Sequence, residues 1–299
     1  MAEHLMGSEN GAEADFAPLV TGDDYVQSLR GRALEVYVLG QRVDEPVDHP
    51  LIRPSINAVA ETYDLACREP ALGQAPTGLN GAPVNRFLHV TRSAHDVVVQ
   101  NRMQRRLGQL TGTCFQRCVG MDAINALFSV THECDAANST TYHDRFRGWL
   151  SHVQRRNLVV GGAMTDPKGD RSKRPAHQDD PDLFVRVVHR DEKGIRIRGA
   201  KMHQTGCINS HWILVMPTMR LLEDEHDFAI VCAIPVDSPG LTFIYGRQSC
   251  DTRALEAGQL DQGNARYSGQ EAMIVLADVF VPHSRVFLDG EVGRGGQAV

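Results

Sequence analysis

The stretch DLFVRVVHRDEKGIRIRGA, residues 182–200, predicts the fold of the second half of the chain. Two short runs rich in β-branched residues, 182–188 and 194–200, flank the sequence RDEK (190–193), which is typical of a hairpin loop. In the second run isoleucines alternate with arginines, so one face of the strand is expected to be buried and the other exposed to solvent. The stretch therefore predicts a β-hairpin at the edge of a core.

Further apolar runs bounded by turns follow the hairpin, and they predict more strands. These are HWILVMP (211–217), FAIVCAIPV (228–236), LTFIYG (241–246) and EAMIVLADVFVP (271–282). Upstream, from about Thr21 to Asn157, the spacing is mainly helical. The clearest example is YHDRFRGWLSHVQRRN, in which Phe146, Trp149 and Val153 share one helix face. A helical block followed by a strand block predicts an α+β fold, with the strands closing into a barrel or two packed sheets.

This pattern divides the chain into four parts. We expect a flexible leader at 1–20, an N-terminal helical domain at 21–157, a β domain at 158–290 and a tail at 291–299. The 299 residues carry a formal net charge of -6 and no basic block, which excludes a nucleic-acid partner. The N-terminus lacks a signal-peptide pattern, and the apolar runs are too short to cross a membrane. Seven irregularly spaced cysteines favour reduced thiols, so we expect a cytoplasmic protein.

The segment LTGTCFQRCVGMDAINAL (110–127) holds two cysteines, Cys114 and Cys118. If the segment is helical, both thiols lie on one helix face. Soft sulfur ligands in this arrangement suit iron or zinc, including one edge of an iron–sulfur cluster. Two cysteines packed in a helical core are the alternative, and the spacing alone favours it because a single C-x₃-C is not specific.

The loop AMTDPKGDR (163–171) lies where the helical block meets the strand block, and domain junctions commonly form cofactor clefts. Lys168 and Arg171 are suited to a pyrophosphate, while Thr165 and the loop backbone can hydrogen-bond a flavin ring. A solvated turn is the alternative, because Asp-Pro and Lys-Gly explain the loop without a ligand.

Two polar features stand at the ends of predicted strands. The run KMHQTG (201–206) can direct His203, Gln204 and Thr205 into a cleft, although a plain turn with a structural histidine is the alternative. Glu271 begins an otherwise apolar strand and is a candidate general base. A strand-end carboxylate that faces water is the commoner case.

Several longer motifs occur in the order found in a known superfamily. VTGDDYVQSLRGRALEVYVLGQRV, followed by HPLI and ETYDLA, resembles the opening of the 4-hydroxyphenylacetate 3-hydroxylase superfamily. AMTDPKGDRSKRPAHQDDPDLFVRVV, GIRIRGAKMHQTGCINSH, IYGRQSCDTR and GQEAMIVLADVFVPHSRVFL resemble its 4-hydroxybutyryl-CoA dehydratase/vinylacetyl-CoA Δ-isomerase branch. TCFQRC stands where the aromatic hydroxylases lack the cysteine pair.

The resemblance implies an acyl-CoA-dehydrogenase-like subunit with a helical domain, a β domain and a C-terminal helical bundle, assembled as a homotetramer. It implies FAD and a [4Fe–4S] cluster as cofactors. The implied reaction is radical dehydration of 4-hydroxybutyryl-CoA to crotonyl-CoA, together with isomerisation of vinylacetyl-CoA. A short-chain hydroxyacyl-CoA is therefore the expected substrate.

The resemblance also assigns roles to single residues. Cys114 and Cys118 match the first two cluster ligands, and Gln116 lies between them near the substrate. Glu271 matches a glutamate implicated in catalysis, and Thr205 is placed near the reactive part of the flavin. The implied flavin contacts are Met164, Thr165, Asp166, Lys168, Arg171, His203, Gln204 and Thr205.

The match to the branch ends near the C-terminus. The family's other two cluster ligands are a histidine and a cysteine seven positions apart, beyond the β domain, whereas this chain ends in VGRGGQAV. We therefore expect the C-terminal bundle to be missing, only two of the four cluster ligands to be present, and the chain alone to be impaired. Two alternatives stay open: an FAD-dependent monooxygenase of the 4-hydroxyphenylacetate 3-monooxygenase type, and a non-catalytic fragment.

Overall fold

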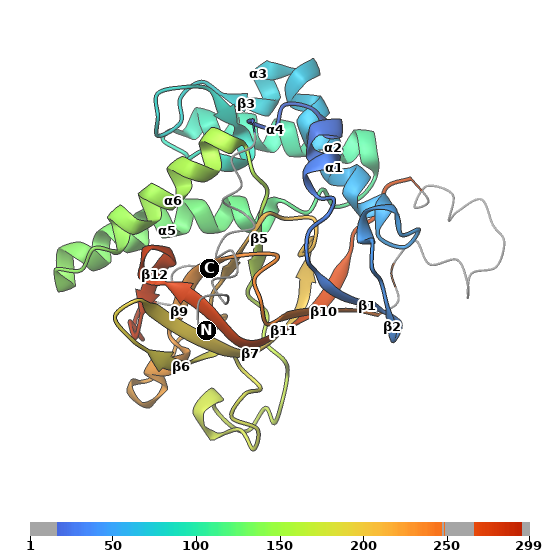
Figure 1. The fold of residues 1–299 in the computed structure, drawn as a ribbon. Coiled ribbons are helices and arrows are strands. Elements are labelled where there is room, and N and C mark those ends of the chain that lie inside the picture. Colours follow the sequence, from blue (N-terminus) through green and yellow to red (C-terminus); the bar gives the residue numbers. More distant parts are fainter. Residues whose placement is uncertain (1–16, 247, 249–265, 295–299) are drawn as a thin grey trace, which may run out of the picture.

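The computed structural model describes residues 17–246, 248 and 266–294. The leader expected at 1–20 and the tail expected at 291–299 therefore lie largely outside the described residues, as does most of IYGRQSCDTR. In Figure 1 the helices gather on one side of the molecule and the strands on the other. No helix in these described ranges is both long enough and apolar enough to span a bilayer.

The helical part begins at a well-defined cap. Thr21 accepts a hydrogen bond from the backbone of Asp24, and the Asp24 carboxylate bonds back to the Thr21 backbone, which is a capping box. The α-helices are α1 (Gly22–Ser28), α2 (Arg53–Arg68), α3 (Pro70–Gly73), α4 (Ala94–Thr111), α5 (Cys118–Asn138) and α6 (Tyr142–Arg156). Short 3₁₀ helices are η1 (Pro46–Asp48), η2 (Arg86–Leu88), η3 (Pro175–His177), η4 (Glu223–Phe228) and η7 (His283–Arg285).

The strands form a large sheet, a smaller sheet and a short two-stranded ribbon. The large sheet contains, in spatial order, β2 (Gln41–Arg42), β1 (Glu35–Val38), β10 (Leu241–Tyr245), β11 (Glu271–Pro282), β7 (Gly194–Thr205) and β6 (Arg186–Arg190). The smaller sheet contains β12 (Val286–Asp289), β9 (Ile230–Pro235), β8 (Trp212–Val215) and β5 (Val160–Ala163). The ribbon pairs β3 (Gln74–Ala75) with β4 (Val84–Asn85). The expected mixture of helices and two packed sheets is thus observed.

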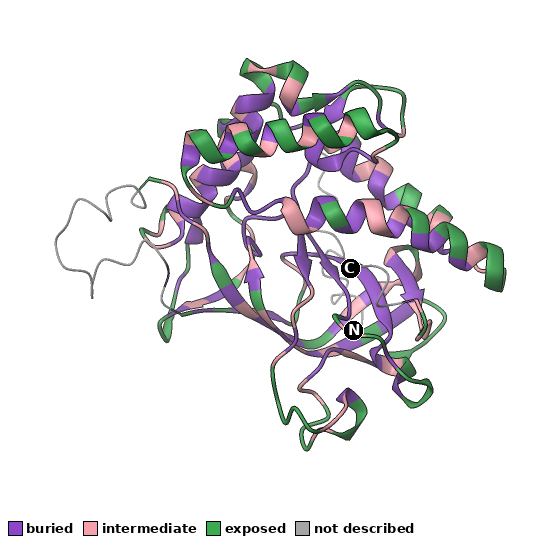
Figure 2. Ribbon diagram, turned by 180° about the vertical axis from the view of Figure 1, so that it is seen from behind, coloured by how far each residue is buried: buried purple, intermediate pink, exposed green. Residues whose placement is uncertain are grey.

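The strand pattern of the sequence matches the layers. In β7 and β11 buried residues alternate with more exposed ones for most of their length, because one face of the large sheet packs on the core and the other is more open. Every residue of β5, β8 and β9 is buried, because α5 and α6 cover one side of the smaller sheet and β7 and β11 of the large sheet pack on the other. Figure 2 shows the buried residues concentrated between these layers.

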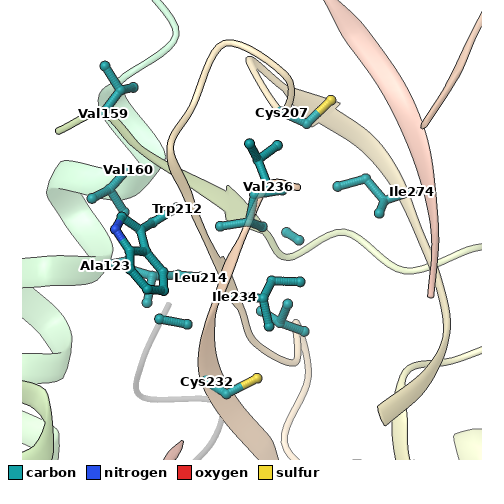
Figure 3. Close-up of a cluster of buried hydrophobic side chains, with 14 of the residues drawn as sticks. Ala123, Val159, Val160, Cys207, Trp212, Leu214, Cys232, Ile234, Val236 and Ile274 are labelled. Carbon is teal, nitrogen blue, oxygen red and sulfur yellow. The ribbon is translucent and has the colours of Figure 1, made fainter. Parts of the chain in front are cut away.

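One apolar cluster joins the layers into a common core. Ala123 of α5, Leu214 of β8, Ile234 of β9 and Ile274 of β11 all belong to it, and Figure 3 shows these side chains directed toward one centre. Burying large aliphatic side chains contributes about 1.5–3 kcal/mol each before entropy is counted. The site described below therefore lies on a framework shared by helices and strands.

Two sequence expectations need correction. The region from Thr21 to Asn157 is not purely helical, because β1 joins the large sheet and pairs in parallel with β10. Val36 and Val38 are buried in β1, a period-2 pattern too short to stand out in the sequence. The hairpin forms as expected, but its first strand begins at Arg186 and not at Asp182, since Asp180 and Asp182 form a turn.

A buried histidine links α1 to the smaller sheet. His211 Nδ1 accepts from the backbone N–H of Val159 at 3.0 Å, and Nε2 lies 2.9 Å from the Ser28 hydroxyl. Burial lowers the pKa of His211 well below its usual value, and the charges of Arg32 and Arg117 lower it further. The ring is therefore neutral in the folded protein, while in the unfolded chain it takes up a proton near pH 6.5.

This difference predicts a loss of stability in mild acid. Below about pH 6.5 His211 is protonated in the unfolded state but stays neutral in the folded state. The free energy of unfolding therefore falls by up to about 1.4 kcal/mol for each unit by which the pH is lowered. Urea unfolding at several pH values between about 7.5 and about 5.5 measures this slope. His211→Gln should make the free energy of unfolding depend less steeply on pH, whereas the same substitution at exposed His95 should leave this dependence unchanged. Equal slopes in both variants would contradict the assignment.

Candidate active site

The two cysteines of the TCFQRC motif lie beside each other, although not in the way expected. Cys118 is the first residue of α5, while Cys114 lies in the loop after α4, so a helix through both is wrong. The backbone turns through the left-handed region at Gln116, with φ 61°, which brings the thiols together. The interaction with the neighbouring Cys118 thiol is the main cause that lowers the pKa of Cys114 to about 6. The same interaction raises the pKa of Cys118.

The start of α5 is placed by close packing on the smaller sheet. A Cβ on Gly120 would lie 2.1 Å from the carbonyl oxygen of Val160, and one on Gly162 would lie 2.2 Å from the Val119 side chain. Only glycine permits these approaches, because any side chain would push α5 away from β5. The two glycines thus determine how deeply Cys118 is set into the molecule.

Gln116 is buried, and its side-chain amide bridges three segments. Its Nε2 donates to the carbonyl oxygens of Ser55 and Ser268, each at 3.0 Å, and its Oε1 accepts from Asn209 at 2.9 Å. A Cβ on Gly206 would lie 2.8 Å from the Gln116 Cβ, so the neighbouring loop also packs closely. These contacts support a role in which Gln116 holds the cysteine loop in position.

Thr205 and Glu271 meet where β7 ends and β11 begins. They are register partners, and the Thr205 hydroxyl donates to Glu271 Oε1 at 2.8 Å. The Glu271 carboxylate is exposed, and its negative charge partly opposes the lowering of the Cys114 pKa. It also adds a little to the rise in the pKa of Cys207, which burial mainly causes. The carboxylate therefore lies within electrostatic range of the thiol pair. The structure brings Cys114, Cys118, Thr205 and Glu271 into one neighbourhood.

The loop that follows β5 is attached to the same neighbourhood through Gln204. Gln204 is buried; its Oε1 accepts from the backbone N–H of Met164 at 3.0 Å, and its Nε2 donates to the Thr165 carbonyl at 3.1 Å. His203, by contrast, is exposed and has φ 52°, at a bulge where the register between β7 and β11 shifts. Bulges of this kind often redirect a side chain beside a functional site.

The charged residues of this loop fall into two groups. Lys168 and Arg171 are exposed and available to an anion, and their contact with a pyrophosphate stays a prediction. Asp166 is buried, and its carboxylate is bonded to Lys201 at 2.6 Å and to the Thr218 hydroxyl at 2.8 Å. The side chains of Asp166 and Gln204 are thus bonded inside the protein, and the direct flavin contact expected for them stays a prediction.

Sequence reasoning missed Lys201. It lies at an inward position of β7, two residues after Gly199 and four after buried Ile197. The alternation of that strand, continued past the GIRIRGA run, would have indicated that a lysine points into the core.

The thiol pair fits two ligands of a metal centre. Cys114 is exposed and its thiol lies near that of Cys118, so both can face a common ion or cluster edge. Within residues 17–246, 248 and 266–294, no group of three or more His, Cys, Asp or Glu side chains is arranged to hold a metal. The [4Fe–4S] cluster therefore stays a prediction that rests on the two cysteines.

Comparison with known proteins places the chain among the 4-hydroxyphenylacetate 3-hydroxylases and their relatives. Residues 21–288 match the family described as 4-hydroxyphenylacetate 3-hydroxylase N terminal, and the chain belongs to this family. Within it the chain is similar to the 4-hydroxybutyryl-CoA dehydratase/vinylacetyl-CoA-Delta-isomerase of Clostridium aminobutyricum. The two are 49% identical over 285 residues, which cover 94% of this chain and 58% of the relative. The resemblance inferred from the motifs is confirmed.

Solved structures agree with this placement. An oxygen-tolerant archaeal 4-hydroxybutyryl-CoA dehydratase from N. maritimus is 62% identical with a TM-score of 0.89, over 93% of this chain and 56% of that one. The FAD complex of HpaB, the oxygenase component of 4-hydroxyphenylacetate 3-monooxygenase, is 22% identical. Its TM-score is 0.76, over 93% of this chain and 57% of that one, and it shows the shared fold. The chain spans a little over half the length of these relatives.

Proposed function

We propose that this chain belongs to an enzyme that dehydrates 4-hydroxybutyryl-CoA to crotonyl-CoA and isomerises vinylacetyl-CoA, using FAD and a [4Fe–4S] cluster. The observation that carries the proposal is that the Cys114 and Cys118 thiols lie near each other and near the hydrogen-bonded Thr205–Glu271 pair. Paired thiols beside a hydrogen-bonded carboxylate provide soft metal ligands and a proton acceptor in one place. The dehydratase relatives at 49% and 62% identity support the same assignment.

Each cofactor has residues suited to hold it. Cys114 and Cys118 would bind one edge of the cluster through their sulfurs. Met164 and Thr165 would contact the FAD ring through the loop backbone, while Lys168 and Arg171 would meet its pyrophosphate. His203 and Thr205 would approach the ring from the end of β7. When bound, FAD supplies reversible one-electron exchange with the substrate, and iron supplies a Lewis acid for the leaving hydroxyl group.

Glu271 is the proposed proton acceptor. The hydrogens next to a thioester carbonyl are the acidic ones of an acyl-CoA, and an exposed carboxylate can reach them. Thr205 holds Oε1 at 2.8 Å, so the second carboxylate oxygen is the one proposed to take the proton. Gln116 keeps the cysteine loop at a constant distance from this carboxylate through its three amide hydrogen bonds.

The setting of the enzyme follows from the same proposal. The cysteines at 67, 114, 118, 134, 207 and 232 are all free thiols, which suits the reducing cytoplasm. A homotetramer, as implied by the family resemblance, and a short-chain hydroxyacyl-CoA substrate are the proposed assembly and partner.

The absorption spectrum of the anaerobically purified protein tests the proposal. We expect flavin bands together with the broad absorption of iron bound by thiolates. Flavin alone, with phenol-dependent oxidation of reduced flavin, would instead identify a monooxygenase in which the cysteines only pack. Absence of both chromophores after incubation with FAD, ferrous iron and sulfide would indicate a non-catalytic fragment.

A further inference from the structure

The ammonium group of Lys201 is buried and fully bonded. Its Nζ donates to Asp166 Oδ1 at 2.6 Å, to the Met164 carbonyl at 3.0 Å and to the Met216 carbonyl at 2.8 Å. A lysine ammonium has three protons, so every donor is used. Lys201 is 2% exposed and Asp166 is 8% exposed, so the pair is removed from water.

The three acceptors come from separate parts of the fold. Lys201 lies in β7 of the large sheet, whereas Met164 directly follows β5 and Met216 directly follows β8 of the smaller sheet. The ammonium therefore joins the two sheets at the point where the chain leaves β5 to form the loop containing Lys168 and Arg171. The backbone N–H of Met202 adds a bond to the Thr165 carbonyl at 2.8 Å.

The buried ion pair by itself contributes little net stability to the fold. Burial lowers the pKa of Lys201, because desolvation penalises its charge, and Asp166 offsets that effect only in part. Buried ion pairs can often be replaced by apolar residues of similar volume without loss of stability. What an apolar pair cannot do is hold the Met164 carbonyl and the Asp166 side chain at fixed positions. The geometry thus points to a positioning role.

We propose that Lys201 and Asp166 are a positioning pair that holds the 164–171 loop in the conformation required to bind FAD. This inference rests on the proposed flavin site, and it assigns the two residues to the support of the loop and not to direct contact with the ring. Thr218 completes the support by donating to Asp166 Oδ2 at 2.8 Å.

Three variants of the 299-residue chain separate positioning from stability. Lys201→Met leaves Asp166 buried without its cation, and it is expected to weaken both folding and FAD binding. The double variant Lys201→Met/Asp166→Leu restores an apolar pair and should recover the thermal midpoint. Its affinity for FAD should nevertheless stay about tenfold to a hundredfold below wild type, the range typical of lost support behind a ligand-holding group. Arg190→Met, which breaks a partly buried ion-pair network with Asp227 and Asp289, is the matched control.

FAD binding is measured by fluorescence titration, and hydrogen exchange of residues 164–171 is measured without FAD. Faster exchange in that loop for the double variant, but not for Arg190→Met, is expected. Wild-type FAD affinity and wild-type exchange in the double variant would overturn the positioning role while leaving the flavin site intact. If the wild-type chain binds no FAD, the flavin site itself is wrong. In that case the hydrogen exchange still tests the pair, because unchanged exchange of residues 164–171 in the double variant would overturn the positioning role.

Discussion

Replacing Glu271 by glutamine is expected to lower the rate of crotonyl-CoA formation by about 10²- to 10⁴-fold, the contribution typical of a positioned general base. Glutamine has nearly the same shape as glutamate, and its Oε1 can still accept the hydrogen bond from Thr205. The substitution therefore removes the proton-accepting ability of the side chain and leaves its packing unchanged. Because Glu271 is exposed, little effect on stability is expected.

A second glutamate provides the control for this experiment. Glu35 is the exposed first residue of β1 in the same sheet, so Glu35→Gln reproduces the change in charge away from the thiols. The anaerobically reconstituted proteins are compared by the formation of crotonyl-CoA and by their thermal midpoints. Activity of Glu271→Gln equal to that of Glu35→Gln would rule out Glu271 as the base.

Replacing either Cys114 or Cys118 by serine is expected to remove nearly all thiolate-bound iron from the reconstituted protein. Serine keeps the size of the side chain but offers a hard, protonated oxygen in place of a soft thiolate. The cysteine that remains would then be a single ligand. Among the described residues, no group of three or more His, Cys, Asp or Glu side chains could hold the iron with it. The two thiols lie near each other, so the loss should be the same whichever is replaced.

Iron and sulfide per chain, counted after anaerobic reconstitution, measure this loss. Cys67→Ser is the control, because Cys67 is a free and exposed thiol on α2, away from the pair. The unchanged chain is expected to retain fewer than four irons per chain, because Cys114 and Cys118 provide only two of the four cluster ligands. If Cys114→Ser or Cys118→Ser retained as much iron as Cys67→Ser, the two cysteines would be packing residues and not iron ligands.

Local patterns in the chain were enough to place the main elements. The run EAMIVLADVFVP forms β11 with the expected bounds, and the RDEK turn joins β6 to β7. Such signals depend on neighbours a few positions apart, because alternation sets which face of a strand is buried and turn residues set where it ends. The order of motifs was likewise sufficient to identify the family.

Contacts between distant parts of the chain were decided only by the tertiary structure. The cysteines meet through a left-handed turn at Gln116, and not through a helix, and Gln116 itself is held by Ser55, Asn209 and Ser268. The Lys201–Asp166 pair joins residues 35 positions apart.

The sequence by itself thus determined the family, the strand framework and the residue types of the site. The packing of the two sheets and α5 decided which of those residues face one another and which support the loop from within. The physical reason is that periodicity reports burial one residue at a time, whereas the partner of a buried polar group depends on which segments the folded core brings within hydrogen-bond distance.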